Sequence, residues 1–205
     1  MGSNCTIYHN CSIGEAPQDL KYAGEKTTAI IGNNVIIRES VTINRGTIAY
    51  GKTEIGNNVL LMACAHVAHD CIIGNHTIMA NLATLGGHVE LGEYVNLGGG
   101  VLVHQFGKIG SHSFVGGGYR AVQDVPPFII AAGEPLRFGG INKIGLQRRG
   151  FSDENRSLIK KAYRLYFISK MRKSDALNKI KAELPATDEI NSIIQFIESS
   201  ERGII

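Results

Sequence analysis

The chain has 205 residues, enough for one compact domain or for one domain with an appendage. Its formal net charge of +3 is too small to indicate a nucleic-acid partner, and its longest apolar stretch, Val59 to Ala65, is too short to cross a bilayer. No signal peptide precedes the repeats, and the four cysteines show neither a CxxC pair nor a disulfide framework, so we expect a cytoplasmic protein.

Between residues 31 and 115 an aliphatic side chain recurs at nearly every sixth position. An aliphatic residue followed by glycine recurs once in every three sixes, at Ile55-Gly56, Ile73-Gly74, Leu91-Gly92 and Ile109-Gly110. Neither period is that of an α-helix or of a half-buried strand, and a fixed period indicates a solenoid. Each six is interpreted as a short strand and a corner, so that three sixes form one triangular coil. The sequence therefore predicts a mainly β fold, with a parallel β-helix over residues 1–135.

Two segments depart from the period. Residues 15–27 carry Asp19 and Glu25 where aliphatic residues are due, and residues 46–52 are a smaller departure. Both are interpreted as loops that leave the prism, and loops on a rigid scaffold often carry function. Ala49 nevertheless keeps the aliphatic phase inside the second of these segments, and the phase taken by itself would point it into the prism.

The period decays after Val115, and residues 136–150 are expected to be a connector. From residue 151 the pattern becomes helical, with Ser152 and Asp153 as N-cap candidates ahead of an apolar helical stripe. Pro185 interrupts this region, and Thr187 starts another helix that is expected to end near Gly203. Residues 151–205 are thus predicted to form a C-terminal helical domain.

Stacking places equivalent residues of successive coils above one another, and this gathers polar side chains at one edge of the prism. The polar members of three adjacent columns, beside Gly87, are His69, Asp70, His88, His104 and Gln105. A lone histidine is usually a surface residue, which is our interpretation of His76 and His112. Clustered histidines can bind a metal, or one of them can act as a general base. The ordinary pKa of a histidine side chain, about 6.5, suits general-base catalysis because it lies near working pH. A backbone N–H of the Gly86-Gly87 step could stabilise an oxyanion.

Six motifs occur in order along the chain, namely Gln18-Asp-Leu-Lys-Tyr-Ala-Gly24, Ile37-Arg-Glu-Ser-Val-Thr-Ile43, Ala65-His-Val-Ala-His-Asp70, Val103-His-Gln-Phe106, Gln123-Asp-Val-Pro-Pro127 and Gly145-Leu-Gln-Arg-Arg-Gly-Phe151. With these motifs and the helical tail, the chain resembles the UDP-N-acetylglucosamine 3-O-acyltransferases of lipid A synthesis from about Tyr8 onward. The resemblance implies hexapeptide repeats coiled left-handed, a homotrimer, and transfer of an (R)-3-hydroxyacyl chain from acyl carrier protein to the 3-position of UDP-N-acetylglucosamine. It implies no cofactor, because the phosphopantetheine arrives on the carrier protein.

The same resemblance implies roles for individual residues. His69 would be the general base, Asp70 its dyad partner, and the Gly87 N–H would face the thioester carbonyl. Substrate contacts are implied for Asp19, Lys21, His66, His88, His104, Gln105, Asn142, Arg148 and Arg149. Asp19 and Lys21 are expected to reach the sugar from a neighbouring subunit, because the loop and the histidine coil are expected on different edges. Gly117 would set the length of the acyl pocket and leave room for a longer chain.

A basic stripe indicates how the carrier protein would dock. Residues 151–173 hold seven Lys/Arg against two Asp/Glu, and Lys160, Lys161 and Arg164 share one helical arc. Such a stripe is usually a solvated face, but acyl carrier proteins are strongly acidic and would be attracted to it.

Three departures from the family pattern leave alternatives open. The segment before Gln18 is short, whereas the family has several more coils there, so an inactive hexapeptide scaffold is one alternative. Asn44 replaces a histidine and Ile144 an acidic residue, which leaves a 3-amino UDP-sugar acceptor as another. The motif that begins at Gln18 argues against a related family, the N-acyltransferases that act on the acylated glucosamine. A zinc site like that of hexapeptide carbonic anhydrases is disfavoured, because this chain lacks the histidine pair at a separation of five that those enzymes use.

Overall fold

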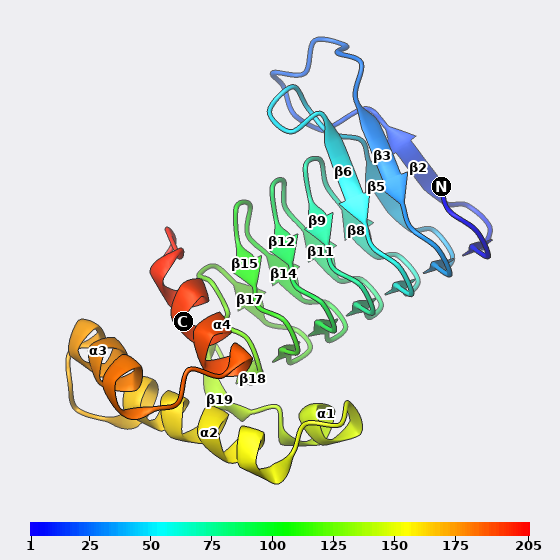
Figure 1. The fold of residues 1–205 in the computed structure, drawn as a ribbon. Helices are drawn as coiled ribbons and strands as arrows, with labels where there is room; N and C mark the ends of the chain where they lie inside the picture. The colour runs from blue at the N-terminus through cyan, green and yellow to red at the C-terminus, as the bar shows by residue number, and fades with distance from the viewer.

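The computed structural model of the protein describes residues 1–205 as a three-faced parallel β-helix followed by helices (Figure 1). Face A comprises β1 (Thr6–Ile7), β4 (Ile36–Ile37), β7 (Leu60–Leu61), β10 (Ile78–Met79), β13 (Asn96–Leu97), β16 (Phe114–Val115), β18 (Ile129–Ala132) and β19 (Arg137–Ile141). Face B comprises β2 (Ser12–Glu15), β5 (Thr42–Asn44), β8 (His66–Val67), β11 (Thr84–Leu85), β14 (Leu102–Val103) and β17 (Arg120–Ala121). Face C comprises β3 (Thr28–Ile31), β6 (Lys52–Ile55), β9 (Ile72–Ile73), β12 (Glu90–Leu91) and β15 (Lys108–Ile109).

The chain visits the faces in the order A, B, C and then returns to A one coil further along. We call the turns between strands of two faces the A–B corner, the B–C corner and the C–A corner. The B–C corner contains residues 68–71, 86–89 and 104–107 of three successive coils. These three turns hold most of the polar columns that the sequence predicts.

Strand register confirms that three sixes make one coil, and it locates both loops. Thr84 pairs with His66 on one side and with Leu102 on the other, so each partner lies three sixes away along the chain. The pairing of Thr28 with Lys52 spans one six more than this repeat, and the pairing of Ser12 with Thr42 spans two sixes more. The additional sixes leave the prism as loops, which project at the end of the stack that holds the N-terminus (Figure 1).

The aliphatic phase predicts that Ala49 points into the prism, and this prediction is wrong. Ala49 lies exposed in the shorter loop, because the whole six-residue unit has been extruded from the coil.

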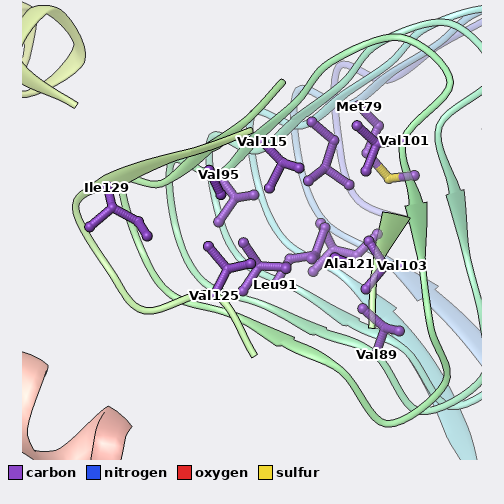
Figure 2. Packing of buried hydrophobic residues seen from close by; sticks show 14 of the residues in the cluster. Met79, Val89, Leu91, Val95, Val101, Val103, Val115, Ala121, Val125 and Ile129 are labelled. Atoms are coloured by element: carbon purple, nitrogen blue, oxygen red, sulfur yellow. The ribbon is translucent and has the colours of Figure 1, made fainter. Parts of the chain in front are cut away.

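The core is a narrow column of aliphatic side chains inside the prism (Figure 2). The second residue of most strands points inward and is almost fully buried, as in Met79, Leu91 and Val103. Small residues such as Val89 and Val95 fill the corners with no exposed surface. This packing explains why aliphatic residues recur and large rings are rare.

Asparagine side chains tie successive coils together at the C–A corner. The Asn57 side-chain oxygen accepts from the Asn33 N–H at 2.8 Å, and that of Asn75 accepts from the Asn57 N–H at 2.7 Å. The Asn75 amide then donates to Glu93 at 2.7 Å. Each coil is therefore bonded to its neighbours through side chains as well as through strands.

The helices are α1 (Lys143–Arg148), α2 (Asp153–Tyr163), the π-helical turn η1 (Arg164–Ile168), α3 (Lys173–Glu183) and α4 (Asp188–Glu198). Ser152 caps α2 and Thr187 caps α4, as the sequence predicts, but α4 ends at Glu198 rather than near Gly203. Residues 136–150 are more ordered than a connector, since they form β19, antiparallel to β18, and α1. None of the helices is long and apolar enough to cross a membrane.

Candidate active site

His69 and Asp70 form a hydrogen-bonded pair at the B–C corner. The His69 Nδ1–H donates to Asp70 Oδ2 at 2.8 Å, and the Asp70 side chain is completely buried. With Nδ1 occupied in this way, His69 Nε2 carries a lone pair, and no hydrogen bond engages it. This arrangement suits an imidazole that accepts a proton at Nε2.

Asp70 is held from both sides by threonines of the preceding coil. The Thr47 N–H donates to Oδ1 at 2.9 Å and the Thr47 hydroxyl donates to Oδ2 at 2.7 Å. The Asp70 N–H donates to the Thr53 hydroxyl at 2.8 Å. Burial raises the pKa of Asp70, but the hydrogen bonds from Thr47 and His69 outweigh burial and leave the pKa below its ordinary value. Asp70 is therefore a carboxylate at neutral pH.

The next coil completes the pair's surroundings with Gly87 and His88. A Cβ on Gly87 would lie 2.6 Å from His69 Nε2, so only glycine leaves room for the imidazole. The His88 ring meets the His69 ring edge-on at 5.1 Å and stacks on Phe106 at 4.5 Å. Burial lowers the pKa of His88, opposed by the charge of Asp70, so His88 is neutral at pH 7. The Gly87 N–H is free of backbone hydrogen bonds and can donate to a ligand.

Asp70 and His88 line a cavity of about 220 Å³ together with Tyr50 and Phe106. His69, Asp70 and His88 also bring potential metal-binding atoms within 4.8 Å of one another. Both oxygens of Asp70 already accept hydrogen bonds, three in all, from Thr47 and His69. Hydrogen bonds from Thr47 and His69 thus account for both carboxylate oxygens of Asp70 and for Nδ1 of His69.

The remaining histidines of the predicted cluster do not contact this pair. His66 lies on β8 of face B, where Nδ1 is 2.7 Å from the Thr42 hydroxyl, and burial lowers its pKa. His104 and Gln105 are exposed at the B–C corner one coil beyond Gly87, and His104 Nδ1 contacts only the Gln105 carbonyl at 3.1 Å.

The long loop leaves the same corner as the His69–Asp70 pair, contrary to expectation. Residues 16–27 connect β2 to β3, and residues 68–71 connect β8 to β9, so both join face B to face C. Asp19 lies close enough to raise the pKa of His88, as a weaker influence than burial. The Asp19 carboxylate accepts from the Lys21 N–H at 3.0 Å. The geometric argument for a neighbouring subunit at this loop is therefore wrong.

Asn44 and Ile144 depart from the family pattern without entering the cluster. The Asn44 side-chain amide donates to the Ala16 carbonyl at 3.0 Å and anchors the base of the long loop. Ile144 is 65% exposed on α1.

Three of the predicted substrate-binding residues, Asn142, Arg148 and Arg149, lie at the C–A corner, far round the prism from His69. The Asn142 side chain caps α1 by accepting from the Gly145 N–H at 3.2 Å, and it donates to the His112 carbonyl at 2.8 Å. Arg148 is exposed, and the Arg149 guanidinium lies 5.0 Å from the centre of the Tyr94 ring. One Arg149 nitrogen is buried without a hydrogen-bond partner, and burial lowers its pKa.

Gly117 lies at the third corner, the A–B corner, where it is exposed and a Cβ would meet the Gly99 carbonyl oxygen at 3.0 Å. The predicted residues thus occupy all three corners. Corners of a triangular prism point away from one another, so a single chain does not bring these residues together.

His112 is not the surface residue that the sequence suggested. Its ring stacks between Tyr94, at 4.9 Å, and Phe128, at 5.6 Å, with Phe151 edge-on at 5.0 Å. Burial, and next the charge of Arg149, lower the pKa of His112 to about 4. His76 stacks on Tyr94 at 4.4 Å at the other end of this column. The one-coil spacing between positions 76, 94 and 112 is the signal that would have revealed the stack.

Known proteins share this fold and sequence. Residues 124–205 match the family described as UDP-N-acetylglucosamine O-acyltransferase, domain 2, and residues 52–87 match the bacterial transferase hexapeptide repeats. The chain is 49% identical over its whole length to the acyl-(acyl-carrier-protein)–UDP-N-acetylglucosamine O-acyltransferase of Thermodesulfovibrio yellowstonii, and it covers 80% of that protein. It is 48% identical to the enzyme of the same name from Trichlorobacter lovleyi, of which it covers 78%.

Solved structures agree with these relatives. LpxA, a UDP-N-acetylglucosamine acyltransferase from Bacteroides fragilis, superposes with a TM-score of 0.98 at 50% identity, over 100% of this chain and 80% of that one. LpxA from Acinetobacter baumannii gives a TM-score of 0.94 at 43% identity, over 98% and 79% of the two chains. These likenesses confirm the left-handed β-helix with a helical C-terminal part. The chain therefore belongs to the UDP-N-acetylglucosamine O-acyltransferase family.

Proposed function

We propose that the protein transfers an (R)-3-hydroxyacyl chain from acyl carrier protein to the 3-hydroxyl of UDP-N-acetylglucosamine, the first step of lipid A synthesis. The single observation that carries the mechanism is the His69–Asp70 pair, with Nδ1 bonded to the buried carboxylate and Nε2 free. Both proposed substrates, the acyl-(acyl carrier protein) and UDP-N-acetylglucosamine, appear in the names of the relatives at 48% and 49% identity.

In the proposed reaction His69 Nε2 takes the proton from the sugar 3-hydroxyl as its oxygen attacks the thioester carbonyl carbon. The Gly87 N–H donates to the oxyanion that develops on the carbonyl oxygen. The carbon–sulfur bond of the tetrahedral intermediate then breaks, which releases the phosphopantetheine thiolate. Protonated His69 gives its proton to this thiolate and returns to its starting form. Asp70 holds the imidazole and stabilises its protonated form throughout. The steps balance without a cofactor.

A homotrimer would complete the site, because the predicted residues occupy three corners. Outward-facing side chains on face A are largely apolar, namely Ile36, Leu60, Ile78, Phe114 and Ile130, whereas on face C they include Glu54, Glu90 and Lys108. We infer that a second copy covers face A. The first copy's Arg148 and Arg149, at the C–A corner that borders face A, would then lie against His69 at the B–C corner of that second copy. The guanidiniums would bind the diphosphate, with Asn142 fixing α1 beneath them.

The other predicted residues take their places in this composite cleft. His66, His104 and Gln105 would contact substrate from face B and its corner, and Asp19 and Lys21 would approach the sugar from the long loop beside His88. Gly117, at the A–B corner, would leave space for the end of a long acyl chain. We propose the cytoplasm as the compartment, consistent with four unpaired cysteines.

The test combines the purified protein with UDP-N-acetylglucosamine and (R)-3-hydroxyacyl carrier proteins of several chain lengths. We expect transfer to the 3-hydroxyl and a loss of at least about 100-fold in His69→Ala, since general-base catalysis contributes that much. His9→Ala is the matched control, because His9 is exposed in the first coil, remote from the site. Absence of transfer by the wild type would refute the function. Equal rates in both variants would refute the role of His69.

A further inference from the structure

Thr47, in the shorter loop, donates more hydrogen bonds to the Asp70 carboxylate than any other residue does. Its N–H reaches Oδ1 at 2.9 Å and its hydroxyl reaches Oδ2 at 2.7 Å, and Thr47 is 6% exposed. His69 contributes one hydrogen bond to the same carboxylate, at 2.8 Å. We propose that Thr47 is a positioning residue for the transfer reaction, which fixes the Asp70 carboxylate so that it orients His69. This inference rests on the proposed function.

The loop is built to present Thr47 in one orientation. A Cβ on Gly46 would lie 2.3 Å from the Lys52 backbone nitrogen, so the loop can enter its turn only with glycine there. The Gly51 N–H donates to the Thr47 carbonyl at 2.7 Å and closes the turn. The Ala49 N–H donates to the Thr47 hydroxyl oxygen at 3.3 Å. Because that oxygen accepts from Ala49, its own hydrogen is free to point at Asp70.

Burial makes these two donors consequential. A carboxylate with no exposed surface is stable only when hydrogen bonds replace its water, and Thr47 supplies two of the three that reach Asp70. A fixed, ionised Asp70 in turn keeps the proton of His69 on Nδ1, which leaves the lone pair on Nε2. Loss of the Thr47 hydroxyl would leave Oδ2 with the His69 hydrogen bond alone, so that the carboxylate could rotate or attract water and would orient the imidazole less firmly.

The kinetic test compares Thr47→Val, which removes the hydroxyl but keeps the N–H, with Thr47→Ser, which keeps both. We expect kcat to fall by about 10-fold in Thr47→Val, the loss of one hydrogen bond to a charged group, with KM for the UDP-sugar within about 2-fold. Thr47→Ser should remain within about 2-fold of the wild type. Thr77→Val is the matched control, because Thr77 is equally buried but bonds the Gly92 carbonyl at the C–A corner.

A double-mutant cycle separates positioning from a general effect on folding. Adding Thr47→Val to Asp70→Ala should cause no further loss of kcat, since Thr47 acts through Asp70. A further 10-fold loss in the double variant, or failure of Thr47→Ser to restore kcat, would overturn the proposal. So would a wild-type kcat in Thr47→Val.

A measurement without substrate tests the same contact if the wild type shows no transfer. The pKa of Asp70, followed by carboxyl carbon NMR, should rise by about 1 pH unit in Thr47→Val and stay unchanged in Thr77→Val. The other ionisable groups facing Asp70 or its cavity are unchanged in both variants; they are His69, Cys71, His88, Tyr50, Glu90, Lys108 and Glu201. An unchanged Asp70 titration would refute the proposed positioning of Asp70 by Thr47, whereas absent transfer with a shifted titration would refute only the enzyme function.

Discussion

At the scale of single residues, the corner positions constrain backbone and chemistry together. Asp70 and His88 have φ values of 59° and 61°, in the left-handed region that Asn, Asp and His tolerate better than most residues. Asn58, with φ 56°, and His76, with φ 59°, occupy the equivalent position in turns of the C–A corner. A histidine at a corner therefore satisfies the backbone whether or not it is functional, so the corner position by itself does not separate His88 from His76.

His112 should make the stability of the fold depend on pH. The unfolded chain binds a proton on this ring below about pH 6.5, whereas the folded ring, with a pKa of about 4, does not. Between these two values the free energy of unfolding falls as pH falls, by roughly 1–2 kcal/mol once partial exposure of the ring is allowed for. His112→Phe removes this titration and keeps the stack, because Phe106 and Phe128 already occupy equivalent positions with φ 62° and 67°.

Urea unfolding of the wild type and of His112→Phe at pH 7.5 and pH 4.5 measures how much of the pH dependence of the free energy of unfolding comes from His112. His66 and His88, whose pKa values are also lowered, are present in both proteins and cancel. We expect the wild type to lose more stability than His112→Phe on acidification. Equal losses would show that His112 does not contribute.

At the scale of elements, the period predicted strands, faces and columns because every coil repeats the same geometry. Counting in coils of three sixes correctly stacked Gly87 on His69 and Phe106 on His88. It could not predict contacts made by segments outside the repeat. The hydroxyl of Thr47 reaches Asp70 along the path of an extruded loop, and Phe151 covers His112 from beyond the solenoid. Both follow from tertiary packing that no local spacing encodes.

Helix α2 and the following turn form the surface on which the carrier protein is expected to dock. Lys160, Lys161 and Arg164 are exposed, make no ion pair and line a hollow with Leu165 and Ile168. Cations around an apolar floor suit an acidic helical partner.

We expect Lys160→Ser/Lys161→Ser to lower kcat/KM for the acyl carrier protein by about 10-fold at low salt, with kcat preserved. The difference should shrink in about 0.5 M salt, where the Debye length is on the order of 4 Å. Lys179→Ser/Lys181→Ser removes the same charge from α3, outside the proposed site, and serves as the control. A loss that is insensitive to salt, or equal in the control, would contradict electrostatic docking.

At the scale of the whole molecule, the three faces differ in what they offer to neighbours. The outward-facing side chains of face A are mostly aliphatic or aromatic, with Asn96 among them, whereas face C carries Glu90 and Lys108 and is partly covered by the C-terminal helices. A trimer that buries face A would leave the part of face C outside these helices in contact with water. The predicted site residues at different corners would then meet between two chains.

A matched pair of substitutions tests this assembly. Ile36, on face A, is 40% exposed and Ile30, on face C, is 43% exposed, so the two differ in face and hardly in burial. We expect Ile36→Asp to shift the mass measured by light scattering from trimer toward monomer, because an isolated carboxylate in an apolar interface is costly. Ile30→Asp should remain trimeric. The reverse result would place the interface on face C.

The contacts around Asp70 come from three consecutive coils, with Thr47 and Thr53 before it and His88 after it. In a solenoid each coil interacts only with its neighbours, so the free energy that organises the pair is local. Coils added or deleted elsewhere in the stack would change the length of the protein without displacing its reactive atoms. Enzymes of this architecture can therefore differ in overall length while sharing one chemistry, since selection on size and selection on catalysis act on separate parts of the stack.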